Sequence, residues 1–247
     1  MVDVNVKILG ISATVIKGGN MDTVVKEALK GAEDIGEALG GGVETEFVNL
    51  ADKEIASCKH CQWCIENRSP CNIEDDFQMI YDKVIECDGF ILGAPAWTFN
   101  VAPKILDFYS RQRYYAFFTN VMRNKVGGAV TTGFFGFGLE NTLNTLRDLI
   151  PIPVARGWAI ASTAAFGQRP AYLEKGVIED TQGMLRVRMV GHKVVEVARM
   201  IKYATENGAV LPYEYRMRTI MGARVLSDDE VSKAKELVKG VWRSKEK

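Results

Sequence analysis

Five short apolar segments alternate with amphipathic segments of helical period along the 247 residues of this chain. The alternation predicts an α/β fold, namely a doubly wound, five-stranded parallel sheet with helices on both faces. Two further observations favour this class: a loop rich in glycine and hydroxyl residues follows the first apolar segment, and the length suits one α/β domain with an appendage. We also expect a cysteine-rich insertion and a C-terminal helical extension.

The predicted strands are runs of β-branched and apolar residues bounded by glycine or polar residues. They cover residues 4–9, 45–50, 89–93, 127–132 and 154–161. The predicted helices repeat apolar residues with a period near 3.6. They cover residues 21–39, 75–86, 103–111, 139–149 and 182–207. Pro103 opens the third helix, and acidic residues at the start of the second suit the positive end of a helix dipole.

The composition argues against several classes of function. Lys plus Arg equals Asp plus Glu at 31 each, so no overall field attracts a polyanion, and we expect no nucleic-acid partner. The N-terminus has no basic stretch followed by an apolar one, and no run of about 18 apolar residues occurs. We therefore expect a cytoplasmic protein without a membrane partner.

Four of the five cysteines form one compact motif, C-x2-C-x2-C-x6-C, made by Cys58, Cys61, Cys64 and Cys71. Three closely spaced thiolates and a fourth from a short loop suit a cubane iron–sulfur cluster, as in bacterial ferredoxin runs. Zinc is the main alternative, although four-cysteine zinc sites usually pair two knuckles across a longer spacer. We interpret Cys87, at the start of an apolar strand, as a buried small hydrophobe.

The loop after the first strand spans residues 10–20 and lacks the spacing of a dinucleotide fingerprint. Backbone N–H groups at a helix start, together with hydroxyl side chains, bind phosphate. A long loop of this kind suits a terminal monophosphate such as that of FMN, and the alternative is a merely flexible glycine turn. The candidate phosphate-binding residues are Ser12, Thr14, Lys17 and Asn20.

Two further loops follow the third and fourth strands, and in a doubly wound sheet they converge with the first. Their amides, hydroxyls and aromatic rings suit a planar heterocycle with a polar edge, while glycines permit close approach. Core packing for Trp97 and Phe99, or an interface for the phenylalanines near 135, are the alternatives. The candidates are Pro95, Ala96, Trp97, Thr98, Phe99, Asn100, Thr132, Gly133 and Gly136.

These motifs resemble the iron–sulfur flavoproteins, a branch of the NADPH-dependent FMN reductase group with a flavodoxin-like fold. The resemblance covers residues 4–205. The loop at 10–20 is similar to the family's phosphate loop, the cysteines match its compact motif, and residues 95–97 followed by 104–111 resemble its second flavin loop. The resemblance implies FMN, a [4Fe-4S] cluster on the four cysteines, and a homo-oligomer, dimer or tetramer, in which one subunit's cluster faces another's flavin.

Two positions depart from the family pattern. Ile16 stands where relatives commonly have Arg, and Met21 stands where they commonly have Thr. The phosphate loop therefore lacks one cation and one hydroxyl, and we expect weaker FMN binding than in relatives.

We expect residues 1–207 to form the flavodoxin-like FMN-binding domain, with the cluster loop at 58–71. Residues 208–247 form the expected helical extension, which carries a capping-box candidate at 227–230 and which we assign to packing or subunit contact.

The expected function is electron transfer between a flavin and a [4Fe-4S] cluster by a flavin-dependent oxidoreductase, with NAD(P)H or ferredoxin as donor or acceptor. The cofactors supply the chemistry, so we expect no catalytic triad. One alternative is an NAD(P)H-dependent FMN or quinone reductase whose cysteines hold a structural zinc. Another is a non-catalytic module that senses redox state through its thiols.

Overall fold

The computed structural model describes residues 4–119, 121–133, 138–150 and 176–209, the backbone at 163–164, and residues 229 and 232. The chain divides into two units, Met1–Glu214 and Tyr215–Lys247. The elements below belong to the first unit. The predicted extension at 208–247 lies almost wholly outside the described residues, so the boundary at 207 stays a prediction.

A parallel sheet with strand order β2-β1-β3-β5-β6 forms the centre of the first unit. Its strands are β1 (Val6–Ser12), β2 (Val43–Asn49), β3 (Gly89–Trp97), β5 (Val126–Thr132) and β6 (Thr163–Ala164). A short strand, β4 (Asn100–Val101), pairs antiparallel with the end of β3. This order is that of flavodoxin-like sheets, which confirms the predicted fold class. The predicted fifth strand at 154–161 lies outside the described residues, whereas β6 pairs with β5 just after it.

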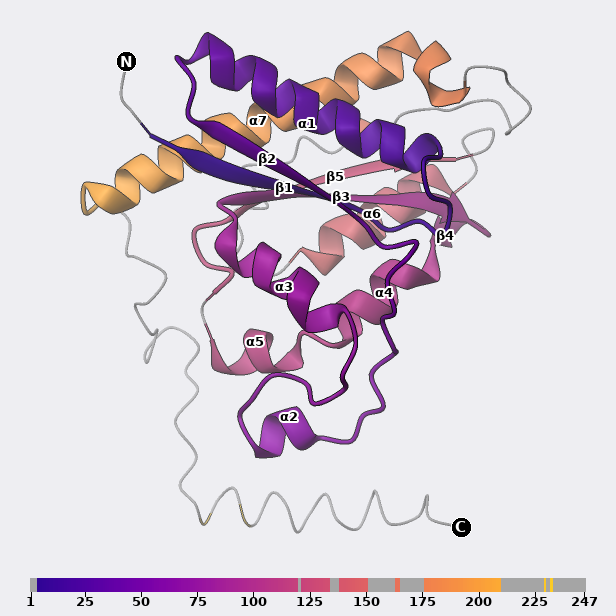
Figure 1. Cartoon of the computed structure of the whole chain (residues 1–247), viewed down its shortest axis with the longest axis vertical. Helices are drawn as coiled ribbons and strands as arrows, with labels where there is room; N and C mark the ends of the chain where they lie inside the picture. The colour runs from indigo at the N-terminus through magenta and orange to yellow at the C-terminus, as the bar shows by residue number, and fades with distance from the viewer. Residues whose placement is uncertain are drawn as a thin grey trace. The chain divides into compact units, whose positions relative to one another are not determined.

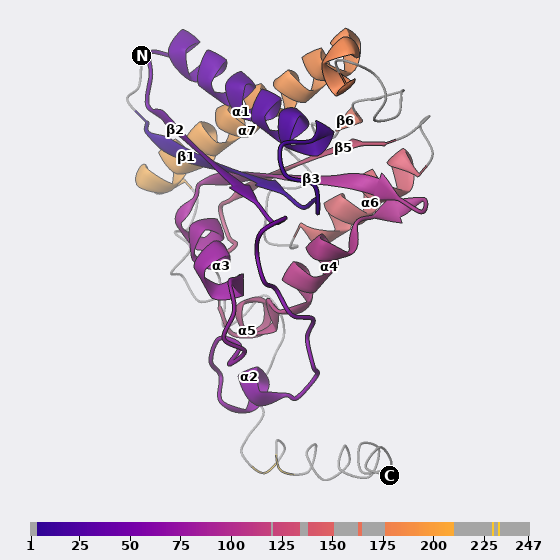
Figure 2. The same cartoon turned by 45° about the vertical axis from the view of Figure 1, so that its right-hand side comes forward.

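Helices cover both faces of the sheet (Figure 1). One face carries α1 (Asn20–Ala38) and α7 (Thr181–Glu206), and the other carries α3 (Phe77–Glu86), α4 (Pro103–Ser110) and α6 (Leu139–Leu149). Two shorter helices, α2 (Trp63–Glu66) and α5 (Arg113–Phe118), lie beyond α3 and α4 on the same side (Figure 2). A 3-10 turn at Gly176–Glu179 precedes α7.

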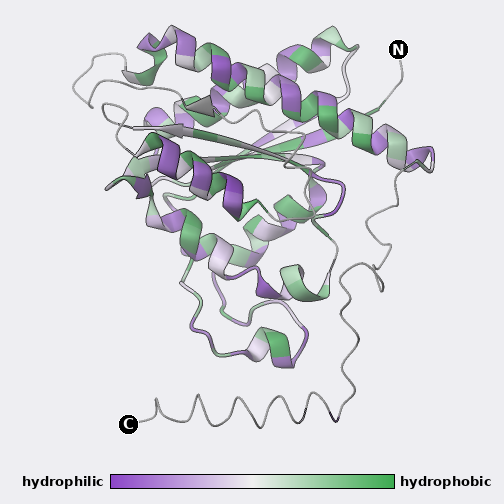
Figure 3. Cartoon of the chain, turned by 180° about the vertical axis from the view of Figure 1, so that it is seen from behind, coloured by the Kyte–Doolittle hydropathy of each residue, from purple (hydrophilic) through white to green (hydrophobic). Residues whose placement is uncertain are grey.

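Two hydrophobic clusters hold these layers together. Leu9, Phe90 and Leu92 point to the α3 side, whereas Ile8 and Ile91 point to the α1 side. Because successive side chains of a strand point to opposite faces, a strand buried on both faces is apolar throughout. The helices instead alternate hydrophobic and hydrophilic residues along their length (Figure 3). Burial of these two clusters is the main source of stability.

Two strands are longer than the sequence predicts. β1 continues through Ser12, which pairs with Asn49 on one side and Gly93 on the other. β3 continues to Trp97 because Pro95 pairs with Thr132. The predicted loops therefore begin later than expected, and Ser12 belongs to a strand. The proline is tolerated because its ring forgoes only one ladder hydrogen bond near the strand end.

In the described part of the chain, no helix combines the length and the hydropathy needed to cross a membrane.

Candidate functional site

Three loops meet at the carboxyl edge of the sheet, beside the point where the strand order reverses between β1 and β3. The backbone N–H of Ala13 donates to the carbonyl of Gly93 at 2.7 Å, so the β1 loop lies directly against β3. Thr132, at the end of β5, is in register with Pro95. Ligands of doubly wound sheets bind in the crevice at this switch point. The ends of β1, β3 and β5 lie side by side at this edge, whereas residues 134–137 of the third loop lie outside the described residues.

The β1 loop leads into α1 with Gly19 as the N-cap residue and no side-chain cap. Backbone N–H groups of the first helical turn are therefore directed toward the loop, as an anion site requires. Thr14 is buried, and its hydroxyl accepts from the N–H of Ile16 at 3.1 Å. Lys17 is exposed and pairs with Asp52. Asn20 accepts from the N–H of Val177 at 3.1 Å, so it ties the loop to the turn before α7.

Asp22 organises this loop, and the sequence analysis did not single it out. Its buried carboxylate accepts from the hydroxyl of Ser12 at 2.6 Å and from the N–H of Gly18 at 2.7 Å. The side chain of Asn49 also donates to it. The Ser12 hydroxyl is therefore directed at a carboxylate within the protein. An acidic residue in the first turn of α1 was the only signal in the sequence, and such residues commonly serve the helix dipole alone.

The second loop is a tight hairpin between β3 and β4. Thr98 and Phe99 form its turn with φ values of 46° and 66°. Both central residues of such a turn have positive φ, which normally favours Asn-Gly, so Thr and Phe are strained there. Trp97 is 40% exposed and Phe99 is 60% exposed. Neither residue belongs to the hydrophobic core, and exposed aromatic rings suit a ligand or a partner.

Polar contacts connect this hairpin to α6, the helix that follows the third loop. The side chain of Asn100 accepts from the N–H of Val101 at 2.8 Å and from the hydroxyl of Thr145 on α6 at 2.9 Å. Thr132 is buried, and Gly133 follows it at intermediate exposure. Gly136, the last of the predicted contacts, lies outside the described residues.

Gly138 lies where the second and third loops touch, and its replacement by alanine tests that contact. Gly138 has φ +72°, and an added Cβ would lie 2.3 Å from the Cα of Phe99. We expect Gly138→Ala to displace the hairpin and weaken FMN binding at least tenfold in a flavin titration. Gly208→Ala is the matched control, because Gly208 has φ +74° but nothing within 4 Å of the added atom. Equal affinities in the two variants would show that the contact is irrelevant to the flavin.

The four motif cysteines lie in the long segment between β2 and α3 that contains α2. Cys64 is buried, Cys58 and Cys71 are partly exposed, and Cys61 is exposed. Burial raises the pKa of the Cys64 thiol; Arg113 opposes this shift, and the thiols of Cys71, Cys58 and Cys61 add to it. Each of the other three thiols is thus close enough to act on Cys64 electrostatically. Four thiols gathered in one loop match the donor set of an iron–sulfur cluster.

The backbone of this segment is strained, like the hairpin. His60, Gln62 and Arg68 have φ values of 52°, 63° and 47°. Positive φ in residues other than glycine persists where surrounding structure demands it, and such positions concentrate at functional sites. The His60 ring is exposed and contacts the side chain of Gln62 at 3.1 Å.

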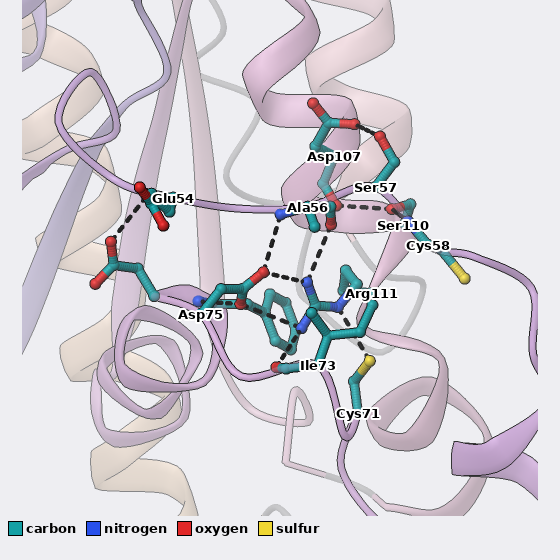
Figure 4. A network of polar contacts seen from close by, with 12 residues as sticks. Glu54, Ala56, Ser57, Cys58, Cys71, Ile73, Asp75, Asp107, Ser110 and Arg111 are labelled. Atoms are coloured by element: carbon teal, nitrogen blue, oxygen red, sulfur yellow. Dashed lines mark hydrogen bonds and ion pairs between the residues drawn. The ribbon is translucent and has the colours of Figure 1, made fainter.

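Arg111, which ends the segment expected to resemble the second flavin loop, lies between the two ends of the cysteine motif (Figure 4). Its guanidinium donates to Asp75 at 2.6 Å and to the sulfur of Cys71 at 3.1 Å. Ser57 donates to Asp107, and the N–H of Cys58 donates to the hydroxyl of Ser110 at 3.1 Å. The end of α4 therefore holds both the beginning and the end of the cysteine motif.

Cys87 is separate from this cluster of thiols. It is buried in the core between α3 and β3, and burial raises the pKa of its thiol to about 12. The prediction of a small buried hydrophobe is confirmed. In the described residues, no group of three or more His, Cys, Asp or Glu side chains could hold a single metal ion.

A flavodoxin-like sheet with three loops at its switch point and a cysteine segment fastened to α4 defines an α/β redox protein. Residues 6–170 match the NADPH-dependent FMN reductase family. A protein of Methanocaldococcus jannaschii named an iron–sulfur flavoprotein is 34% identical over 202 residues, which cover 79% of this chain and 99% of the relative. Another, from Methanosarcina thermophila, is 30% identical over 79% of this chain and 97% of the relative.

The chain therefore belongs to the NADPH-dependent FMN reductase family and, within it, to the iron–sulfur flavoproteins. Among solved structures, RosB superposes with a TM-score of 0.59 at 16% identity and covers 90% of this chain and 96% of its own. That likeness shows the fold. Membership identifies the chain as a flavin-dependent oxidoreductase.

Proposed function

We propose that this protein binds FMN at the switch-point loops and a [4Fe-4S] cluster on Cys58, Cys61, Cys64 and Cys71, and transfers electrons between them. The observation that carries the proposal is that one uninterrupted stretch of chain, residues 95–111, contributes to both candidate sites. At one end this segment forms the strained hairpin beside the β1 loop, and at the other Ser110 and Arg111 hold the cysteine segment. This segment thus joins the two candidate sites along the chain.

The chain's own residues have separate tasks in this proposal. Thr14, Lys17, Asn20 and the first turn of α1 bind the FMN phosphate, and Ser12 orders the loop through Asp22. The flavin ring lies against residues 95–100 and the loop that contains Thr132, Gly133 and Gly136. When bound, the flavin exchanges electrons in pairs and the cluster exchanges them singly, and the protein supplies orientation and tuning of their potentials.

The proposed partners follow from the number of electrons that each cofactor exchanges. NAD(P)H suits the flavin as a two-electron donor, and a one-electron carrier such as ferredoxin suits the cluster. We further propose a cytoplasmic homo-oligomer, dimer or tetramer. Exposed side chains near the site, among them Trp97, Phe99 and Phe117, are 40%, 60% and 67% accessible in the isolated chain and are available for such contacts.

Anaerobic reduction tests the proposed electron transfer. NADPH is added to protein that contains both cofactors, and flavin absorbance is followed together with the EPR signal of a reduced cluster. We expect the flavin bands to bleach first and the cluster signal to grow as electrons pass on. Flavin reduction in iron-replete protein without any cluster signal, even with dithionite as donor, would contradict the proposal.

The missing cation in the phosphate loop gives a second test. Ile16 is 59% exposed at the position where relatives commonly have Arg. We expect Ile16→Arg to tighten FMN binding about twofold to fivefold, since an exposed ion pair contributes up to about 1 kcal/mol. A fluorescence titration at low salt measures the affinity, with Ile16→Gln as the uncharged control. An unchanged affinity would show that the phosphate does not lie near Ile16.

A further inference from the structure

We propose that Arg111 is a positioning residue for Cys71, and that its Nε–H···Sγ hydrogen bond raises the reduction potential of the cluster. The proposal rests on the proposed function, because it assumes that the four cysteines hold an iron–sulfur cluster.

Every N–H group of the Arg111 guanidinium donates a hydrogen bond. A guanidinium carries five N–H donors in a fixed fork. Nε donates to the sulfur of Cys71 at 3.1 Å. Nη1 donates to Asp75 at 2.6 Å and to the carbonyl of Ala56 at 3.0 Å. Nη2 donates to Asp75 at 3.2 Å and to the carbonyl of Ile73 at 3.1 Å. All five donors have acceptors, and the sulfur is one of them.

The ion pair between Arg111 and Asp75 is buried. The Arg111 side chain is 0% exposed and that of Asp75 is 7% exposed, and the guanidinium lies 4.8 Å from the centre of the Phe77 ring. Interactions of a buried charge are screened far less than those at the surface. A surface arginine beside a thiolate would matter little, whereas this one acts through a medium of low polarity.

The acceptors of the Arg111 guanidinium lie on both sides of the cysteine motif in the sequence. Ala56 precedes the first cysteine of the motif, whereas Ile73 and Asp75 follow the last. One side chain therefore clamps both ends of the motif and contacts its fourth sulfur directly (Figure 4). The clamp thus holds Cys71 close to the segment that leads into the first cysteine.

The effect on potential has a definite sign. Adding an electron makes the cluster more negative, and a hydrogen bond from a cationic donor to a ligand sulfur stabilises added negative charge. Asp75 neutralises the pair overall, but it binds the Nη atoms, so the Nε–H remains directed at the sulfur. Arg113 also acts electrostatically on Cys64. Arg111 is distinct in donating to the sulfur itself.

The test measures the reduction potential of the cluster by redox titration monitored by EPR, together with iron content. The double variant Arg111→Gln, Asp75→Asn removes the pair without leaving a buried charge alone. We expect its cluster to be at least tenfold harder to reduce, which for one electron is a shift of about 59 mV to lower potential. Arg147→Gln is the control, since Arg147 lies on α6 and donates to Asn144; its potential should equal that of the wild type.

If the double variant does not retain iron, Arg111→Lys gives the measurement, because lysine keeps the charge but lacks the fork. We expect it to bind iron with a smaller shift in the same direction. A fully loaded variant, double or Lys, with the wild-type potential would overturn this inference and leave the proposed function intact. Wild-type protein without iron would overturn the proposed function, and this inference with it.

Discussion

Replacement of Cys64 by alanine is expected to reduce the iron content from about four atoms per chain to less than one. Cys64 is the buried member of the motif, and burial, with a further contribution from the other three thiols, raises the pKa of its thiol. A cubane that loses its most enclosed ligand is open to solvent at that corner. FMN content should stay unchanged, because the flavin loops follow β1, β3 and β5. Iron analysis and flavin release on anaerobically purified protein measure both.

Cys87→Ala is the matched control for this experiment. Cys87 is also buried, but it caps the C-terminus of α3 just before β3 and lies outside the motif. Its replacement should leave iron and flavin at wild-type levels and cost only some stability through the small cavity. Full iron in Cys64→Ala, or equal loss of iron in both variants, would contradict the proposal that the motif cysteines bind the cluster.

Asp75→Asn is expected to destabilise the folded protein by about 3 kcal/mol, because it leaves the buried guanidinium of Arg111 without its counterion. The side chains of this pair are 7% and 0% exposed. Asp107→Asn is the control. It weakens an exposed hydrogen bond from Ser57 in the same region, and should cost less than about 1 kcal/mol. Denaturant unfolding at pH 7 measures both variants.

The same pair predicts a dependence on pH. Burial opposes ionisation of Asp75, yet hydrogen bonds from Arg111 and from the N–H groups of Ala56 and Phe77 outweigh it and lower the pKa of the carboxyl. A carboxyl with a lowered folded pKa stabilises the protein above its unfolded pKa of about 4, and the contribution is lost as the pH falls through the folded value. The gap between wild type and Asp75→Asn should therefore shrink below about pH 4. A gap that stays constant down to pH 2 would contradict the assignment.

The fold was predictable because the strands of a parallel sheet are buried on both faces. The run Gly89–Gly93 is apolar throughout, and the helices around it carry a period of 3.6, so alternation alone identified the layers. The helix predicted at 75–86 begins at Phe77, because Asp75 accepts from the N–H of Phe77 ahead of the first turn. Local hydrogen bonding of this kind shifts a helix boundary without changing the pattern.

The candidate site was predictable only in part. Glycine and hydroxyl residues indicated the β1 loop, and cysteine spacing indicated the cluster loop. Asp22 was missed because an acidic residue in a first helical turn commonly serves the helix dipole alone. The Arg111–Asp75 pair was missed because it acts across long sequence separations: the side chains of Arg111 and Cys71 meet 40 positions apart. A buried charge gives no signal in a pattern of apolar residues until the fold brings its partner to it.

The proposal that the chain binds both FMN and a [4Fe-4S] cluster is tested by iron, zinc and flavin analysis, with a visible absorption spectrum, on protein purified without oxygen. The account predicts about four irons and one FMN per chain, with broad cluster absorbance beneath the flavin bands. Zinc with flavin, and no iron, would contradict the proposal. The cysteines would then hold a structural zinc, and the protein would be a simple flavin reductase.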